Sequence, residues 1–527
     1  MTQPSQLLAN LEKQLRVRGD AVAVSGQSGT LSFRELSEQS SRIARRLMKD
    51  AGGTAGQRIG VLAPADLAWA TAFVGILRSG AVVVPLSPLH PPAEQHRISQ
   101  TARLDRLLVA SELADPDSAL QCELRVDGIE EMLALDSGAA WDGKGPQRPP
   151  NVTASSGAVM LFTSGTTGQP KGVQLSHGNL WALVDGLRTA WEFSEDDRLL
   201  HSLPLHHLHG IAVAFMVCLW SGGSTKFLRR FQSQALFSEF AEATVWMAVP
   251  AQHQTLLDAA ETASKTERQR WAADARTLRL VTSGSAALSS KMGARVAELF
   301  GQYPLERYGM TEVGIVLSNP HEESQRQAGS CGRPVGGAEI RIVDEQGIDV
   351  AEGESGEIWI RGPSVFAAYF DAPEATAKGF AGSWFRSGDT AKFRADGYVQ
   401  ILGRTSVDII KSAGYKLSAL EIEAVLKEHP AVREISVVGV PDEKWGEVVV
   451  AAVVPAATDS VELSVDSLAS FAKDELARYK LPRRLVQVEE LPKNALGKVM
   501  KTVLRAEIEA RLLRTAERKS AEPGSDV

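Results

Sequence analysis

The segment from Leu161 to His177 combines small, hydroxyl-bearing and basic residues at close spacing. After the apolar run Ala158–Phe162, the chain reads Thr163-Ser164-Gly165-Thr166-Thr167-Gly168-Gln169-Pro170-Lys171-Gly172. Glycines let successive backbone N–H groups turn inward as an anion-binding nest, while hydroxyls add donors and a lysine adds mobile positive charge. The pattern therefore predicts a loop that closes around phosphate groups.

Two other interpretations of this loop are weaker. An exposed Ser/Thr/Gly linker would not normally follow a buried strand, which Ala158–Phe162 predicts. A Walker-type P-loop fails because neither Gly165 nor Gly168 leads into Gly-Lys-Ser/Thr at the required interval. Pro170 would also obstruct the helix that such a loop opens. A different kind of phosphate loop is expected.

Residues 161–173 resemble the signature of the adenylate-forming superfamily of acyl-CoA synthetases, luciferases and peptide-synthetase adenylation domains. The resemblance extends over nearly the whole chain. It implies an acid–CoA ligase, in which ATP converts a carboxylic acid into an acyl-adenylate and coenzyme A then takes the acyl group. The loop residues implied to bind ATP are Thr163, Ser164, Gly165, Thr166, Thr167, Gly168 and Lys171.

Two further segments resemble the nucleotide motifs of that superfamily. Residues 306–312 match a motif in which Tyr308 stacks on adenine, and residues 283–287 match a segment whose backbone lies along it. The implied ATP contacts are Gly284, Ser285, Ala286, Tyr308, Gly309, Met310 and Thr311. Glu312 would hold Mg²⁺, a hard cation that prefers oxygen ligands. Without the resemblance, residues 308–312 could be an aromatic turn before the acidic start of a helix.

Residues 384–389 and 403–411 resemble the ribose-binding and hinge motifs. Asp389 would accept hydrogen bonds from the ribose hydroxyls, since an ionised carboxylate can take both. Arg404 would approach the ribose or a phosphate, and the pivot of the hinge would be Thr405 or Ser406.

Two segments after the hinge complete the implied machinery. The thiol-bearing arm of coenzyme A would pass the backbone at Gly414, Tyr415 and Lys416. Residues 492–498 resemble a C-terminal motif whose lysine, here Lys498, reaches the site and catalyses adenylation together with Thr311 and Glu312. As an isolated sequence, residues 492–498 would read as a basic exposed loop.

The resemblance is closest to malonyl-CoA and methylmalonyl-CoA synthetases, notably in residues 203–210, 283–287 and 404–411. The second carboxylate of such a substrate requires a cation, most naturally an arginine fork. Arg279 is the leading candidate. Arg230 is the second, although paired arginines are often a solvated face.

Three other features bear on the acid. His207 is expected to border the acyl pocket, because no carboxylate or thiol completes a metal site with His206 and His209. Residues 249–253 depart from the malonate enzymes. A ligase for short or medium-chain monocarboxylic acids, a carrier-protein acyl ligase and a catalytically silent nucleotide-binding regulator therefore remain alternatives.

The elements that position these groups follow from the apolar pattern. Ser32 to Glu35 has the spacing of a capping box and predicts a helix towards Lys49. An apolar helix from Asp66 to Arg78 leads into a β-branched run at 82–84, an alternation typical of αβ units. Residues 329–402 contain short β runs between turn residues. Helices near 418–428 and 465–479, with strands near 434–440 and 448–454, predict an α+β domain.

We therefore expect an α/β protein of two domains. The N-terminal ATP- and acid-binding domain, residues 1–403, would contain two αβ-layered subdomains and a small β-barrel at about 329–402. A hinge would join it to a mobile α+β domain, residues 404–514, followed by a disordered tail, residues 515–527.

Composition limits the partners of the 527-residue chain. A net charge of -7 without a long basic block argues against nucleic acid, and the longest apolar stretch, Leu67–Leu77, is too short to span a membrane. The three cysteines have no paired spacing, and neither terminus matches an address signal, so a cytoplasmic location is expected.

Overall fold

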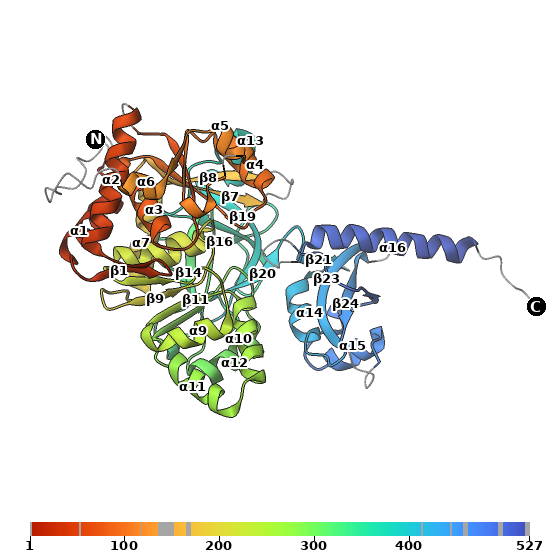
Figure 1. Cartoon of the computed structure of the whole chain (residues 1–527). Coiled ribbons are helices and arrows are strands. Elements are labelled where there is room, and N and C mark those ends of the chain that lie inside the picture. The colour runs from red at the N-terminus through yellow and green to blue at the C-terminus, as the bar shows by residue number, and fades with distance from the viewer. Residues whose placement is uncertain are drawn as a thin grey trace, which may run out of the picture. The chain divides into compact units, whose positions relative to one another are not determined.

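The computed structural model describes residues 3–51, 54–115, 117–134, 152–164, 170–412, 415–442, 445–456, 462–493 and 499–521. Contacts divide the chain into two compact units (Figure 1). Unit 1 comprises Met1–Ile340 and Ile360–Phe385, and unit 2 comprises Arg341–Trp359 and Arg386–Val527. The domain boundary expected after residue 403 concerns movement and stays a prediction.

Unit 1 contains a nine-stranded sheet of order β15-β14-β13-β12-β11-β9-β10-β1-β2. Its central strands, from β1 to β13 in this order, run parallel, whereas β2, β14 and β15 pair antiparallel at the edges. The strands are β1 Val22–Gly26, β2 Gly29–Ser32, β9 Arg198–His201, β10 Ser224–Phe227, β11 Val245–Ala248, β12 Leu280–Ser283, β13 Leu305–Met310, β14 Gly314–Ser318 and β15 Arg333–Pro334.

A second, six-stranded sheet of unit 1 has the order β6-β5-β3-β4-β7-β8. It is parallel except for the hairpin of its last two strands. The strands are β3 Arg58–Leu62, β4 Val82–Leu86, β5 Arg106–Val109, β6 Val126–Gly128, β7 Gly157–Ser164 and β8 Pro170–Ser176. The predicted buried strand at 158–162 is thereby confirmed.

Helices α3 (Leu67–Ser79) and α7 (His177–Ala190) each contact strands of both sheets. Every residue of α3 from Trp69 onward is buried, which explains its apolar sequence. Asp66 caps α3, and the predicted capping box between Ser32 and Glu35 starts α2 (Phe33–Ala51). The other helices are α1 Gln6–Val17, α4 Pro92–Ala102, α5 Ala119–Glu123, α6 Ile129–Ala134, α8 Val217–Trp220, α9 Ser233–Glu239, α10 Pro250–Thr262, α11 Lys265–Ala275, α12 Ser290–Phe300 and α13 Pro373–Gly379.

The predicted β-rich part forms a third sheet. Its order is β16-β17-β19-β18, with β20 paired to β19. The strands are β16 Glu339–Val343, β17 Gly356–Arg361, β18 Phe380–Ala381, β19 Trp384–Phe393 and β20 Val399–Arg404. Two αβ-layered sheets, this smaller sheet and a compact α+β part confirm the predicted fold class.

The α+β part of unit 2 is a sheet of order β22-β21-β24-β23, with β25 on β24. Alternate residues of the long hairpin β23–β24 enter two cores, one with α14 and α15 and the other with α16. The elements are β21 Ile409–Ser412, β22 Tyr415–Ser418, α14 Ala419–Leu426, β23 Val432–Asp442, β24 Gly446–Pro455, α15 Val465–Ala472, β25 Arg484–Gln487 and α16 Lys501–Ala521.

Two predictions about unit 2 are wrong. The helix expected to reach Tyr479 ends at Ala472, because the chain turns there and places Leu476 in the core. The tail expected to be disordered from residue 515 is helical as far as Ala521, since Ala, Glu, Arg and Lys continue to favour helix. Within the described ranges, no helix is long and apolar enough to cross a membrane.

Candidate active site

The predicted phosphate loop lies at the tip of the β7–β8 hairpin. The two strands are antiparallel, with Ser164 opposite Pro170 and Thr163 opposite Lys171. The chain therefore reverses direction at the position where the nest was expected. The four loop residues Gly165, Thr166, Thr167 and Gly168 lie outside the described residues, and their contact with phosphate stays a prediction.

Tyr369 connects Lys171 with Glu312. The ammonium of Lys171 lies 5.2 Å from the centre of the Tyr369 ring, and the Tyr369 hydroxyl donates a hydrogen bond of 2.9 Å to Oε1 of Glu312. The neighbouring amide of Phe370 donates to the carbonyl of Gly172 on β8, which holds the tyrosine in place. A cation and a carboxylate suited to Mg²⁺–nucleotide binding thus meet at one ring. No motif in the sequence pointed to Tyr369.

The two expected adenine segments leave neighbouring parallel strands. Ser283 at the end of β12 pairs with Glu306 on β13, so the residues that follow each strand emerge at the same edge. Ser285, Ala286 and Ala287 are exposed, and Ser285 adopts a left-handed φ of 67°. Ligands of open α/β sheets bind at the carboxyl ends of their strands, which is where these segments lie.

The last residues of β13 and the first residue after it, Tyr308 to Thr311, are partly exposed. Position 309 has no room for a side chain. A Cβ there would lie 2.0 Å from the carbonyl oxygen of Gly314. The irregular β13–β14 pairing therefore requires glycine, and Thr311 begins the turn that follows Met310.

The ribose and hinge candidates lie in unit 2. Asp389 on β19 pairs with Arg404 on β20, and Nε of Arg404 is 3.1 Å from Oδ1 of Asp389. Arg404 also donates to the carbonyl of Ser387 at 2.6 Å. Tyr415 stacks on Tyr479 with ring centres 4.4 Å apart. Gly414, Lys498 and the side chain of Lys416 lie outside the described residues.

Arg307 is the most unusual charged residue of unit 1. Its side chain is buried, and among the described residues its Nε and Nη2 atoms have no hydrogen-bond partner. A Cβ at position 284 would lie 2.3 Å from its Cζ, so the guanidinium packs directly against Gly284. Burial lowers the pKa of Arg307 to about 10, which leaves it charged at neutral pH. A buried cation without an anion is expensive unless a ligand supplies one.

A histidine-rich segment ends at His209, which is buried and interacts electrostatically with Arg307. The chain leaves β9 at His201 and passes His206 and His207, whose ring centres are 4.1 Å apart, to His209. Nε2 of His207 and both ring nitrogens of His209 have no partner in the described part of the chain. Burial lowers the pKa of His207 to about 4, and burial together with the charge of Arg307 holds the pKa of His209 well below its usual range. Neutral imidazoles are therefore available as hydrogen-bond donors.

Over the described ranges, no three His, Cys, Asp or Glu side chains are placed to hold a metal ion. The segment that departs from the malonate enzymes begins α10, where His253 is fully buried and its Nε2 lies 3.2 Å from the carbonyl oxygen of Thr282. The departure at His253 is therefore explained by packing under β12.

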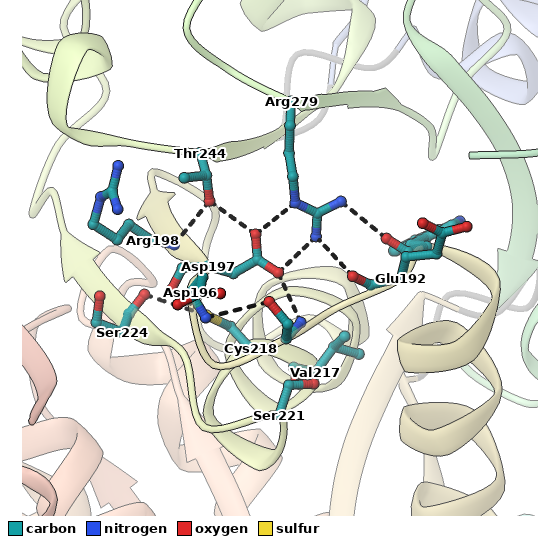
Figure 2. Close-up of polar contacts among 12 residues, drawn as sticks. Glu192, Asp196, Asp197, Arg198, Val217, Cys218, Ser221, Ser224, Thr244 and Arg279 are labelled. Atoms are coloured by element: carbon teal, nitrogen blue, oxygen red, sulfur yellow. Dashed lines mark hydrogen bonds and ion pairs between the residues drawn. The ribbon is translucent and has the colours of Figure 1, made fainter. Parts of the chain in front are cut away.

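Arg279 forms the expected arginine–carboxylate fork, but with a residue of the protein. Its Nε and Nη2 lie 2.7 and 2.6 Å from the two carboxylate oxygens of Asp197 (Figure 2). It also donates to the carbonyls of Trp191 and Glu192. Asp197, whose side chain is 2% exposed, accepts a further bond from Thr244. The hydrogen-bonding capacity of Arg279 is thus used inside the fold.

Arg230 is exposed at the rim of a surface pocket of about 530 Å³ after β10. Lys226 and Arg229 also line this pocket. Arg229 is ion-paired with Asp66 at 2.7 Å and with Glu112 at 2.8 Å. Arg230 therefore lies on a solvated surface.

Comparison with known proteins gives the family. A model described as AMP-binding enzyme matches residues 11–370, and a model described as AMP-binding enzyme C-terminal domain matches residues 421–498. The chain belongs to the AMP-binding, adenylate-forming enzymes. It is an AMP-forming acid–CoA ligase, as its motifs predicted.

Individual relatives of this ligase act on small diacids. It is 38% identical over 520 residues to the mitochondrial malonate–CoA ligase ACSF3 of Mus musculus, covering 92% of this chain and 88% of that one. It is 32% identical to the oxalate–CoA ligase of Arabidopsis thaliana, covering 95% and 97%. ATP-bound MatB from Rhodopseudomonas palustris is 30% identical, with a TM-score of 0.85 and coverage of 97% and 99%.

The sequence analysis of the ligase missed Arg307. This residue stands inside the 306–312 motif, in which the family resemblance implied roles only for residues 308–312. Successive side chains of a strand point to opposite faces, so a β assignment of 305–310 would have separated Arg307 from Tyr308, the residue expected to stack on adenine. The alternation of side chains along this strand could therefore have indicated that Arg307 faces a different site from Tyr308.

Proposed function

We propose that this ligase activates a short dicarboxylic acid, with malonate or methylmalonate as the preferred substrate. The observation that carries the proposal is the buried guanidinium of Arg307, whose Nε and Nη2 have no hydrogen-bond partner among the described residues. A distal carboxylate would give it the missing acceptor as a bidentate fork, and His209 could donate a further bond. A monocarboxylate would leave the same guanidinium buried and unpaired, which is unfavourable.

The reaction has two steps. A carboxylate oxygen of the acid attacks the α-phosphorus of ATP, pyrophosphate leaves, and the thiolate of coenzyme A then attacks the acyl carbon and expels AMP. Lys498 and Thr311 would stabilise the charge at the α-phosphate, while Lys171 and its loop hold the β and γ phosphates. Mg²⁺, held with Glu312, would neutralise phosphate charge. The buried oxygen ligand at Glu312 suits this ion.

The remaining nucleotide contacts follow the family pattern. Tyr308 would stack on adenine beside the exposed backbone after Gly284, and Asp389 would accept from the ribose hydroxyls beside Arg404. Free coenzyme A would enter past Gly414, Tyr415 and Lys416. Arg279 and Arg230 are not carried into the acid pocket, since one is paired internally and the other is exposed.

An acid panel tests the substrate. Pyrophosphate release with coenzyme A present would be measured for malonate, methylmalonate, oxalate, propionate and hexanoate. We expect the highest kcat/KM for malonate or methylmalonate and the lowest for hexanoate. A preference for oxalate would indicate a shorter acid pocket, suited to the substrate of the Arabidopsis thaliana oxalate–CoA ligase. A preference for propionate or hexanoate would contradict the role of Arg307. Nucleotide binding without pyrophosphate release for any acid would indicate a silent regulator.

The division of labour between the two steps is tested by Lys498→Ala. We expect the variant to lose acid-dependent pyrophosphate exchange and to keep thioester formation from supplied acyl-adenylate. An equal loss of both half-reactions would contradict the proposed role of Lys498. The acyl acceptor is tested separately, by measuring thioester formation with a carrier-protein thiol in place of coenzyme A.

We also propose a reducing, cytoplasmic location. The spacing of Cys122, Cys218 and Cys331 in the sequence is not that of a disulfide framework, in keeping with such a compartment. The relative from Mus musculus carries the word mitochondrial in its name. Fractionation of cells with an antibody to this chain would distinguish the two compartments.

A further inference from the structure

Lys501 is a buried ammonium in unit 2 that faces two carboxylates. Its Nζ lies 2.7 Å from Oδ1 of Asp408 and 2.8 Å from Oε1 of Glu423, and the three side chains are 10%, 13% and 17% exposed. The amide of Val437 donates to the same Glu423 oxygen at 2.6 Å. The cluster thus joins the start of α16 to α14, β23 and the turn that contains Asp408. Removal of the lysine would leave two buried carboxylates facing each other.

Asp408 closes the turn in which the pivot was expected. Its Oδ2 accepts from the amide of Arg404 at 2.9 Å, and its own amide donates to the Arg404 carbonyl at 2.8 Å. Its carbonyl accepts from the amide of Ala419 at the start of α14. The backbone of Asp408 is therefore fixed to α14, and its carboxylate is fixed to Lys501. Residues 405–407 lie between the two bonded positions Arg404 and Asp408.

Lys501 also follows the base of the segment that carries Lys498. Lys493 and Val499 form an antiparallel bridge, and the amide of Met500 donates to the carbonyl of Pro492 at 2.8 Å. Lys493 is ion-paired with Glu434 on β23 at 2.5 Å. Residues on both sides of 494–498 are thus tied to the sheet next to Lys501.

We propose that Lys501 is a positioning residue for the adenylation step. By clamping Asp408 to the base of the 494–498 segment, it makes the hinge turn and the Lys498 attachment one rigid piece. Rotation at the hinge is then confined to residues 405–407, and Lys498 is delivered to a single place. This inference rests on the proposed role of Lys498.

The two half-reactions of Lys501→Met test the proposal. We expect kcat for acid-dependent pyrophosphate exchange to fall about a hundredfold, because displacement of a catalytic group by about 1 Å has an effect of this size. KM for ATP and thioester formation from supplied acyl-adenylate should stay within about twofold of the parent. Lys501→Arg keeps the charge and should recover most of the exchange activity.

Arg505→Met is the matched control. Arg505 is one turn further along α16, is half-exposed, and pairs with Glu447 and Glu509. Its removal should change neither half-reaction. If Lys501→Met does not fold, the double variant with Glu423→Gln relieves the repulsion between carboxylates and takes its place.

Two outcomes overturn the proposal, namely an equal loss in both half-reactions and unchanged adenylation in a folded variant without Lys501. Adenylation that survives Lys498→Ala would instead overturn the proposed role of Lys498, on which this inference rests. The two failures are therefore distinguishable.

Discussion

Two arginines, one near each end of strand β12, are in opposite electrostatic situations. At the amino end, Arg279 is paired with Asp197 and two backbone carbonyls. At the carboxyl end, Arg307 packs on Gly284 with two nitrogen atoms that lack a partner in the described chain. Arg279 therefore uses its hydrogen-bond donors within the protein, whereas Arg307 has donors available for a ligand.

This difference teaches that the partner of a charged group, rather than its type, indicates function. Both arginines could clamp a carboxylate, but only Arg307 packs against the predicted adenine segment, at Gly284. Parallel strands gather binding residues at their carboxyl ends, while their amino ends are available for internal pairing. The pair at Arg279 and Asp197 therefore reads as structure, and the unpaired Arg307 reads as a site.

The largest expected effect is that of Arg307→Met. We expect kcat/KM for malonate to fall roughly a thousandfold, because the buried carboxylate of the substrate loses its cation. This fall corresponds to a loss of about 4 kcal/mol in transition-state stabilisation. Propionate should lose far less. Steady-state pyrophosphate release with both acids measures the two ratios.

Stability sharpens this test, because Arg307→Met removes an unpaired buried charge and should not lower the unfolding free energy. Arg230→Met is the control, and its exposed side chain predicts no change with either acid. Equal losses for malonate and propionate would show that Arg307 does not contact the second carboxylate.

Arg279→Met should have the opposite profile. It leaves Asp197 buried without its cation, which we expect to cost about 3 kcal/mol in the free energy of unfolding, measured with urea and tryptophan fluorescence. KM for malonate should not change. The double variant with Asp197→Leu should recover part of the lost stability. A raised KM at unchanged stability would move the acid site to the amino end of β12.

Gly284→Ala should have a smaller effect that acts through Arg307. The new Cβ would lie 2.3 Å from Cζ of Arg307, so the guanidinium must shift. We expect KM for malonate to rise about tenfold while KM for ATP stays constant.

Adding Gly284→Ala to Arg307→Met should change nothing further, since both act on one group. An additive loss in the double variant, or a raised KM for ATP alone, would assign Gly284 to the nucleotide instead.

Local signals in the sequence were sufficient for most of the fold. Some segments could be predicted because their conformation depends on residues close to them in sequence. Examples are the capping box at Ser32 and Glu35, the apolar helix after Asp66 and the β-branched runs of 432–455. The helix expected to reach Tyr479 failed for the opposite reason. Its end depends on Leu476 entering a core formed by distant strands.

The candidate site divides in the same way. The motifs around Lys171, Tyr308 and Glu312 are continuous in sequence and were found there. The choice between Arg279 and Arg307 depends on Asp197, which is 82 residues from Arg279 in the chain. Spacing alone contains no information on such a pair. Tyr369, which joins Lys171 to Glu312, was missed because its contacts are equally distant in sequence.

The smallest expected effect is a constant malonate KM between pH 6.5 and pH 9, because Arg307 keeps its charge up to a pKa of about 10 and the histidines beside it are already neutral. Stability should behave differently. Burial lowers the pKa of His201 and His253 to about 4. Between pH 6.5 and pH 4 these two histidines are therefore protonated in the unfolded chain but remain neutral in the folded chain. Unfolding free energy should therefore fall as the pH falls through this window, by up to about 1.4 kcal/mol per pH unit for each histidine.

His253→Gln separates these two quantities, because His253 lies under β12 and outside the proposed pocket. Urea unfolding at pH 7.5 and 5.5 should show a shallower loss of stability in the variant, with the same malonate KM as the parent. A malonate KM that instead rose about tenfold per unit between pH 7 and pH 8 would follow the deprotonation of a histidine. The charge that binds the acid would then belong to His207 or His209, and Arg307 would have only an auxiliary part.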